Sequence, residues 1–246
     1  SFTGSADTAL KLRANPHLLR HSIPFVAEQD SLNGSVLGPD VTPGAPEFDL
    51  FVKEVTREMT AKAGQKCTAI RRVIVPDKAV QPVIEAVSAR LGKIAVGDPR
   101  SDGVRMGPVV SASQRRDVLE KAAVIGSEAE VVFGGQDGFA PVGDVENGAF
   151  VAPTLYHCAD PDSAVQVHGT EAFGPVSTVM GYRDLDHAMA LANKGKGSLV
   201  ASLITHDPDV AREVAVGIGA WHGRVYINDR DSATEATGHG APMPHL

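Results

Sequence analysis

Ala63-Gly64-Gln65-Lys66-Cys67-Thr68-Ala69 joins a predicted helix to a predicted strand. Upstream of this stretch, apolar residues recur at spacings of three and four, the pattern of an amphipathic helix; they are Phe48, Phe51, Val55 and Met59. Gly64 is a residue type that ends helices. Downstream, residues 70–75 predict a short strand, which Pro76 closes. Cys67 therefore lies at a junction between two regular elements.

Cys67 has two interpretations on spacing alone. A single cysteine in an apolar context is commonly a small buried hydrophobic residue. As a nucleophile, Cys67 would lie at the C-terminal end of a helix, where the helix dipole disfavours a thiolate. A nucleophilic Cys67 therefore needs activation by a general base from another segment, with Lys66 as a nearby positive charge.

The run Gly64-Gln65-Lys66-Cys67 resembles the active-site signature of the aldehyde dehydrogenase superfamily, in which Gly-Gln-x-Cys carries the catalytic thiol. The resemblance implies that Cys67 is the nucleophile. Phe2-Thr3-Gly4-Ser5, followed by a helical run over residues 7–14, is suited to holding phosphate at a helix N-terminus. Taken alone it is equally a helix cap. It also resembles the cofactor-pyrophosphate turn of the family, which implies cofactor contacts from Gly4 and Ser5.

Residues 23–27 predict a strand with Glu28 at its carboxyl end, where open α/β sheets bind ligands. A surface carboxylate is the alternative interpretation of Glu28. In the family this segment reads Glu-Leu-Gly-Gly and carries the general base, so the resemblance implies that Glu28 is the base. Here Gln29-Asp30-Ser31 replaces the glycines. With the Pro- and Gly-rich loop 38–46, this departure is similar to the branch that oxidises CoA-thioester semialdehydes in phenylacetate or benzoate catabolism.

The run Glu171-Ala172-Phe173-Gly174-Pro175-Val176 resembles the Glu-x-Phe-Gly-Pro-Val motif of the family. The resemblance implies that Glu171 accepts hydrogen bonds from the nicotinamide ribose hydroxyls, as a carboxylate can, and that Phe173 packs near the nicotinamide ring. A turn with a buried aromatic is the alternative. Residues 224–228 resemble the family strand whose following loop borders the substrate tunnel.

Helices and strands alternate along the chain, which predicts an α/β fold with a mostly parallel sheet and helices on both faces. Further helices are expected over residues 77–91 and 185–193, after a Ser111 cap and after Asp207-Pro208; further strands are expected over 130–133, 199–204 and 224–228. The resemblance divides the chain into a dinucleotide-binding remnant (1–33), a catalytic cysteine domain (34–228) and a truncated substrate-tunnel loop (229–246). The abrupt ends suggest a fragment of a longer polypeptide.

Composition narrows the function classes. The net charge of −7, from 23 Lys and Arg against 30 Asp and Glu, argues against nucleic acid, and no apolar run is long enough for a membrane span. Two distant cysteines fit a reducing cytoplasm, with Cys158 expected to be structural. No metal site is expected, because the spacing of His222, His239 and His245 predicts solvated loop histidines. Asn33-Gly34-Ser35 is expected to be a turn.

The resulting hypothesis is a cytoplasmic enzyme that oxidises an aldehyde with NAD or NADP, through a thiohemiacetal and a thioester on Cys67. The substrate is a semialdehyde, with a CoA thioester as one candidate, and the full-length protein is expected to be a homo-oligomer. One alternative is a non-catalytic structural or oligomerising fragment, or a pseudoenzyme of the same fold. Another is a cysteine hydrolase, which needs a histidine partner for Cys67.

Overall fold

The computed structural model describes residues 1–234 and 238–240. The chain divides into two compact units, Ser1–Ser31 and Leu32–Leu246. Their assignment to a cofactor-binding remnant and a catalytic domain stays a prediction, as does the tunnel-loop role of residues 229–246, of which 235–237 and 241–246 lie outside the described residues.

The first unit contains two short strands and two helices: β1 Phe2–Thr3, α1 Ala6–Arg13, α2 Pro16–Arg20 and β2 Ala27–Glu28. β1 and β2 pair in parallel, with Thr3 opposite Glu28. The predicted strand over 23–27 is wrong except at Ala27, since Pro24 has no N–H to donate to a strand partner. The unpredicted α2 begins where Asn15 caps the helix and Pro16 takes its first position.

The second unit is built on one large sheet in the order β11-β10-β3-β4-β9-β8-β7. Its strands are β3 Gly34–Leu37, β4 Arg72–Pro76, β7 Glu130–Gly134, β8 Thr154–Cys158, β9 Val176–Tyr182, β10 Ser198–Ile204 and β11 His222–Asn228. Neighbouring strands pair in parallel, except β7, which pairs antiparallel with β8 at one edge. The predicted mostly parallel sheet is confirmed. A separate parallel pair joins β5 Ala95–Val96 to β6 Val104–Met106.

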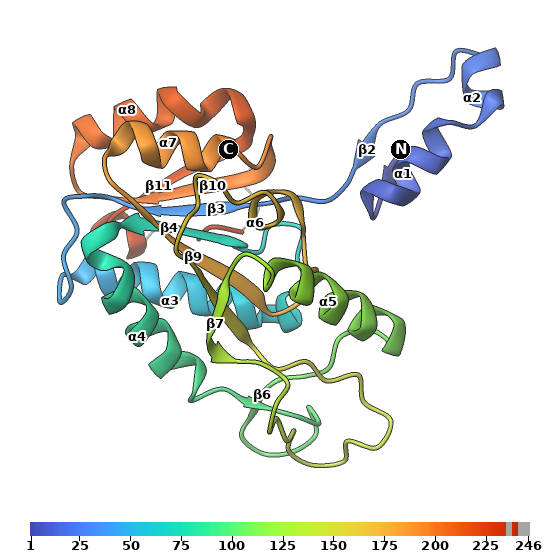
Figure 1. Cartoon of the computed structure of the whole chain (residues 1–246), viewed down its shortest axis with the longest axis horizontal. Helices are drawn as coiled ribbons and strands as arrows, with labels where there is room; N and C mark the ends of the chain where they lie inside the picture. Colours follow the sequence, from blue (N-terminus) through green and yellow to red (C-terminus); the bar gives the residue numbers. More distant parts are fainter. Residues whose placement is uncertain (235–237, 241–246) are drawn as a thin grey trace. The chain divides into compact units, whose positions relative to one another are not determined.

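Helices cover both faces of this sheet, as predicted (Figure 1). One face is covered by α7 Leu185–Asn193 and α8 Pro208–Ile218, and the other by α3 Pro46–Thr60 and α4 Val80–Leu91. The chain also forms α5 Ala112–Ile125 and the short α6 Gln166–Gly169. Successive residues of a strand point to opposite faces, so Ile74 of β4 packs in the core with Leu191 of α7, and Val73 packs in the core with Phe51 of α3.

The helix starts follow the predicted caps, with one exception. The Ser111 side chain accepts a hydrogen bond from the Gln114 N–H, and Asp207 accepts from the N–H groups of Asp209 and Val210. Asp77 does not cap the next helix, because residues 77–79 form a 3₁₀ turn and α4 begins only at Val80.

The predicted turn at Asn33-Gly34-Ser35 is wrong. Gly34–Leu37 is the buried strand β3, which lies between β10 and β4 in the middle of the sheet. Asn and Gly are rare in strands and common in turns, which explains the error. Strand pairing on both sides overrides those local preferences.

Two histidines expected to be solvated are instead buried. His222 begins β11 and is 8% exposed, and His239 is 1% exposed. Each imidazole Nδ1 lies within hydrogen-bond distance of a β10 serine hydroxyl, 2.7 Å for His222 to Ser198 and 2.8 Å for His239 to Ser202. Burial lowers the pKa of His222 to about 4 and that of His239 to about 3. His245 lies outside the described residues.

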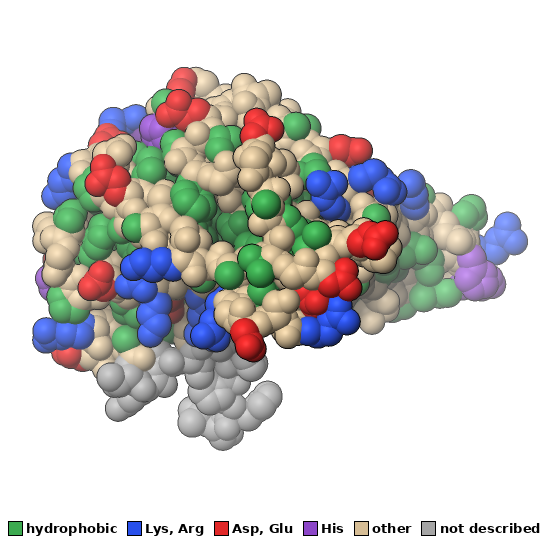
Figure 2. Space-filling model, turned by 90° about the horizontal axis from the view of Figure 1, so that it is seen from below, with side chains coloured by type: hydrophobic (Ala, Val, Ile, Leu, Met, Phe, Trp, Pro, Cys, Tyr) green, Lys and Arg blue, Asp and Glu red, His purple; other side chains and the backbone are tan. Residues whose placement is uncertain are grey.

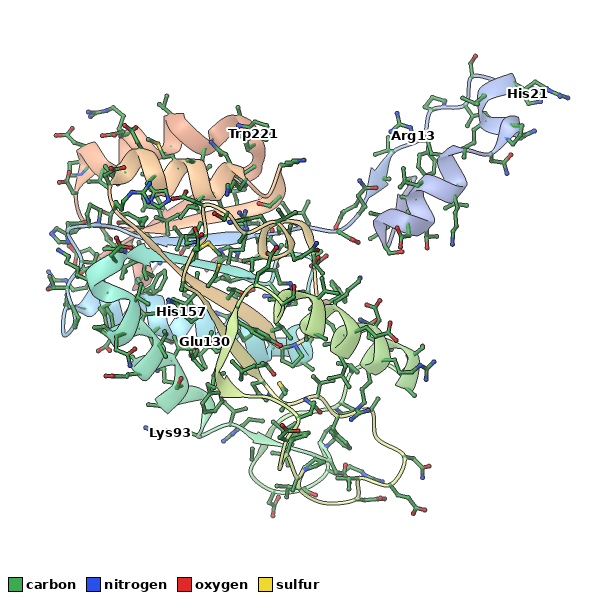
Figure 3. The ribbon with its side chains drawn as sticks, in the orientation of Figure 1. Arg13, His21, Lys93, Glu130, His157 and Trp221 are labelled. Carbon is green, nitrogen blue, oxygen red and sulfur yellow. The ribbon has the colours of Figure 1, made fainter. Side chains whose placement is uncertain are left out.

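The described surface mixes charges of both signs. Figure 2 shows Lys and Arg side chains interspersed with Asp and Glu across the face it presents, which is typical of a solvated surface. At the β7–β8 edge, Glu130 and His157 are cross-strand partners, with His157 Nδ1 3.4 Å from Glu130 Oε1 (Figure 3). Among the described residues, the helices are too short or too polar to cross a membrane, and no group of three His, Cys, Asp or Glu side chains could hold a metal ion.

Candidate active site

Cys67 is exposed at the end of a tightly wound loop. The loop leaves the 3₁₀ turn Ala61–Gly64 and leads into β4. Lys62, Ala63 and Gly64 have φ values of 54°, 53° and 70°, a run of three left-handed residues. Only glycine fits at Gly64, since a Cβ there would lie 2.1 Å from the Gly174 carbonyl oxygen. The cysteine loop and the Gly174 segment are therefore in direct backbone contact.

Asn33 holds the backbone of the cysteine loop. Its Nδ2 donates to the carbonyls of Cys67 at 2.8 Å and Ala69 at 3.0 Å, and its Oδ1 accepts from the Val200 N–H at 3.0 Å. Asn33 is fully buried, so these bonds join β3, the cysteine loop and β10 in a dry environment. The carbonyl of Cys67 is thus held from the core, although the residue as a whole is exposed.

The charge of Lys66 is paired within the fold. Its Nζ lies 2.7 Å from both carboxylate oxygens of Glu58 on α3, and the Glu58 side chain is 3% exposed. This pairing weakens any stabilisation that Lys66 offers to a neighbouring thiolate. A Cβ at Gly240 would lie within 3 Å of Lys66 Nζ and Thr68 Oγ1, so the described residues 238–240 lie against the cysteine loop.

Glu171 and Phe173 lie in the segment between α6 and β9. Glu171 is 6% exposed, and its Oε1 accepts from Arg71 Nε at 3.2 Å. Phe173 is half-buried, and the Arg71 guanidinium carbon lies 5.6 Å from its ring centroid. Two of the residues predicted to hold the cofactor, Glu171 and Phe173, therefore share one arginine.

The same arginine reaches the cysteine loop. Arg71 Nη2 donates to the carbonyls of Gly64 at 2.9 Å and Lys66 at 3.4 Å, and Nη1 donates to the Gly174 carbonyl at 2.7 Å. Burial lowers the pKa of Arg71, and Glu171 opposes that shift. The sequence predicted Arg71 only as part of the strand over residues 70–75. Its only sequence signal is the presence of two arginines beside the apolar residues of a buried strand.

In the second unit, these groups lie at the end of the sheet where its parallel strands begin. Asn33 precedes β3, Arg71 precedes β4 and Gly174 precedes β9, so all three lie at the amino ends of parallel strands. Open α/β sheets commonly bind ligands at the opposite, carboxyl edge. The left-handed loop before β4 and the Asn33 amide instead place the cysteine at the amino ends of the strands.

In the first unit, Gly4, Ser5 and Glu28 come together around the start of α1. The Gly4 N–H donates to the Glu28 carbonyl at 3.0 Å, and Ser5 is the helix N-cap. Asp30 Oδ1 accepts from the Ala6 N–H at 3.0 Å, so a carboxylate already occupies this helix N-terminus. The turn therefore suits an anion chemically. Glu28 and Cys67 belong to different units, so their pairing as base and nucleophile stays a prediction.

A surface hollow of about 650 Å³ lies between residues 108–112 and the loop 136–150. It adjoins the cysteine loop, because the Val110 N–H donates to Gln65 Oε1 at 2.9 Å. None of the predicted site residues lines it. Cys158 is also remote from this chemistry: it is buried in β8, where burial raises the pKa of its thiol, in keeping with a structural role.

Comparison with known proteins identifies relatives across most of the chain. The sequence model of the aldehyde dehydrogenase family matches residues 1–241. The chain is 48% identical over 245 residues to 3,4-dehydroadipyl-CoA semialdehyde dehydrogenase of Aromatoleum evansii, covering 99% of this chain and 48% of that protein. It is 44% identical over 142 residues to protein MaoC of Klebsiella aerogenes, covering 57% of this chain and 41% of that protein.

Solved structures give the same result for the fold. Betaine aldehyde dehydrogenase of Staphylococcus aureus in complex with NAD+ matches with a TM-score of 0.80 and 27% identity, covering 93% of this chain and 43% of that one. A mutant aldehyde dehydrogenase C of Pseudomonas syringae, with NAD+ and octanal, matches with a TM-score of 0.77 and 28% identity, covering 92% of this chain and 44% of that one. The chain thus spans about half the length of the relatives it matches.

Proposed function

Because the chain belongs to the aldehyde dehydrogenase family, we propose that it carries the catalytic cysteine of an NAD(P)-dependent aldehyde oxidation. The observation that carries this proposal is the geometry around Cys67. Cys67 is an exposed residue, its backbone is held by Asn33, and its loop is joined through Arg71 to Glu171 and Phe173. An accessible thiol on a rigid loop is suited to repeated attack on a substrate carbonyl.

The reaction begins at the Cys67 sulfur. Its thiolate forms a bond to the aldehyde carbon, and the carbonyl electron pair moves to oxygen to give a thiohemiacetal. The bound nicotinamide cofactor supplies the acceptor for the hydride that leaves this carbon. Loss of the hydride turns the thiohemiacetal into a thioester on Cys67. Glu28 then takes a proton from water, which attacks the thioester and releases the acid and the thiolate.

Two groups of residues are chemically suited to different parts of a dinucleotide. At the start of α1 the Ala6 N–H donates to the Asp30 carboxylate, so an anionic phosphate is chemically suited to the same turn. The Glu171 carboxylate, ionised beside Arg71, is an acceptor of the kind a ribose diol requires. We assign phosphate contacts to Gly4 and Ser5, and ribose and ring contacts to Glu171 and Phe173.

We further propose a semialdehyde carrying a CoA thioester as the substrate. This rests on the 48% identity over 99% of the chain to a protein named for 3,4-dehydroadipyl-CoA semialdehyde, against 27% to betaine aldehyde dehydrogenase. The cytoplasm is the proposed compartment, since it keeps the two cysteines reduced. We also propose that the full-length protein forms a homo-oligomer, because the chain belongs to the aldehyde dehydrogenase family.

A cysteine hydrolase finds less support. Among the described histidines, His239 lies against the cysteine loop, where its imidazole interacts with the Thr68 backbone. Its Nδ1 is engaged with the Ser202 hydroxyl, and burial lowers its pKa to about 3. A general base works best with a pKa near the operating pH, which disfavours His239 as a partner for Cys67.

The test is a single-turnover assay on the full-length protein with excess NAD+ or NADP+ and a CoA-thioester semialdehyde. We expect a burst of about one reduced nicotinamide per Cys67, because hydride transfer precedes thioester hydrolysis. Cys67→Ala should abolish the burst, and Cys158→Ala is the matched control that keeps it. Glu28→Gln should keep the burst and slow the steady-state rate. Turnover in Cys67→Ala would overturn the proposal.

A further inference from the structure

We propose that Arg71 is a positioning residue, which rests on the function proposed above: its guanidinium sets the position of the Cys67 loop relative to the Glu171–Phe173 segment. A nucleophile and a cofactor must be held within a fraction of an ångström of their productive geometry. Here the two segments are about a hundred residues apart in sequence, their backbones touch at Gly64 and Gly174, and both bond to the one side chain of Arg71.

The nitrogen atoms of Arg71 divide between the two segments. In the bonds described, Nη2 donates only to the cysteine loop, at the carbonyls of Gly64 and Lys66. Nε and Nη1 donate to the other side, to Glu171 and the Gly174 carbonyl. Because the guanidinium is rigid and planar, a shift of either segment breaks hydrogen bonds to the other. The arginine therefore acts as a spacer of fixed dimensions.

The charge arrangement supports a role beyond packing. Arg71 is 5% exposed and Glu171 is 6% exposed, so the pair is removed from water. A buried carboxylate without its cation is strongly disfavoured in the ionised form. The Arg71 guanidinium, with Nε 3.2 Å from Glu171 Oε1, favours the carboxylate form of Glu171, which accepts hydrogen bonds at both oxygens. The guanidinium also lies over the Phe173 ring, which orients the aromatic residue proposed to face the nicotinamide.

The chain offers a matched control in the next residue. Arg72 is also buried, but its guanidinium donates to the carbonyls of Leu32, Leu191 and Ala192. Its Nη1 also lies 3.3 Å from His168 Nδ1 on α6, but none of the hydrogen bonds described for Arg72 reaches the cysteine loop or residues 171–174. A substitution at Arg72 therefore reports the cost of losing a buried cation, without the link between the two segments.

The test compares Arg71→Lys and Arg71→Gln with Arg72→Lys in the full-length protein. We expect both Arg71 variants to raise the KM for the nicotinamide cofactor by about tenfold to a hundredfold, the range for a lost charged hydrogen bond. Arg72→Lys should lower stability without that change in KM. Lysine should not rescue Arg71, because one ammonium cannot bind both segments in the geometry of the fork.

A second readout follows the link itself. The rate of Cys67 alkylation by iodoacetamide is measured with and without NAD+, in the wild type and in Arg71→Gln. We expect NAD+ to change the alkylation rate of Cys67 in the wild type. In Arg71→Gln most of this change should disappear, since the cofactor site and Cys67 are coupled through Arg71. In a double-mutant cycle on cofactor KM, Arg71→Gln and Glu171→Gln should be strongly non-additive.

The outcomes separate the two proposals. A wild-type protein without a hydride burst would remove the dehydrogenase function, whatever the Arg71 variants do. A normal wild-type burst, with Arg71 variants that match Arg72→Lys in KM and in alkylation, would overturn the positioning role alone. Additive effects in the double-mutant cycle would do the same, since independent residues add.

Discussion

Arg71 and Arg72 are neighbours in the chain and both are buried, yet their hydrogen bonds serve different parts of the molecule. Arg71 bonds to Glu171 and to carbonyls of the cysteine loop. Arg72 bonds to the carbonyls of Leu191 and Ala192, which lie in the last turn of α7. Successive side chains of an extended segment point to opposite faces, so one dipeptide supplies a cation to each face of the sheet.

The two cations are stabilised by different means. The last carbonyls of a helix lack intrahelical partners and carry partial negative charge, so α7 offsets part of the Arg72 charge. Burial still lowers the pKa of Arg72 to about 10. Backbone approach is close there, since a Cβ at Gly195 would lie 2.4 Å from Arg72 Nη2. A cation bound by helix carbonyls supports the fold, whereas one bound by a motif carboxylate supports the site.

The largest expected effect that tests whether Arg72 supports the fold is the loss of stability in Arg72→Met. Removing this guanidinium leaves the carbonyls of Leu32, Leu191 and Ala192 buried without their donor, so the free energy of unfolding should fall by about 4 kcal/mol. Urea denaturation of the full-length protein measures it. Arg90→Met, an exposed position on α4, is the control and should change stability by less than about 0.5 kcal/mol. Equal midpoints for the two variants would show that Arg72 is not structural.

His168, which contacts Arg72, should make the protein less stable in acid. His168 Nδ1 lies 3.3 Å from Arg72 Nη1, its Nε2 lies 3.0 Å from the Pro161 carbonyl, and burial lowers its pKa to about 4. Between pH 6.5 and 4 the unfolded state binds more protons, so stability falls with decreasing pH, by up to about 3 kcal/mol. His168→Gln should flatten this dependence in denaturation curves measured from pH 7 to 4. An unchanged slope would contradict a neutral buried His168.

Helix α3, on the other face, should show the opposite pH dependence. Burial, with repulsion from Glu58, raises the pKa of Glu54 to about 7. Between pH 4.5 and 7 the folded state binds more protons, so this residue lowers stability as the pH rises. Glu54→Gln should therefore stabilise the protein at pH 8 by about 2 kcal/mol and much less at pH 5. Glu85→Gln on the exposed side of α4 is the control; equal effects of the two changes at pH 8 would argue against a buried, protonated Glu54.

The sequence predicted elements where local pattern and tertiary environment agree. α7 was expected over the residues it occupies, and Ser111 and Asp207 cap their helices as expected. β3 was missed, because Gly34 and Ser35 follow Asn33 in a run of turn formers by local preference and become a strand only through pairing on both sides. His222 and His239 were misjudged for a similar reason, since burial depends on distant segments rather than on neighbours in sequence.

The candidate site divides in the same way. The sequence by itself determined the fold class, the family and the position of the cysteine on the connection between α3 and β4, because each depends on residues close together in the chain or on a contiguous motif. Only the tertiary structure decided that Asn33 holds the Cys67 backbone and that Arg71 joins the cysteine loop to Glu171. The Asn33–Cys67 contact joins residues 34 positions apart, and the Arg71–Glu171 contact joins residues 100 positions apart. Which carbonyls and carboxylate a buried side chain meets at such separations is set by strand order and register, which no local pattern records.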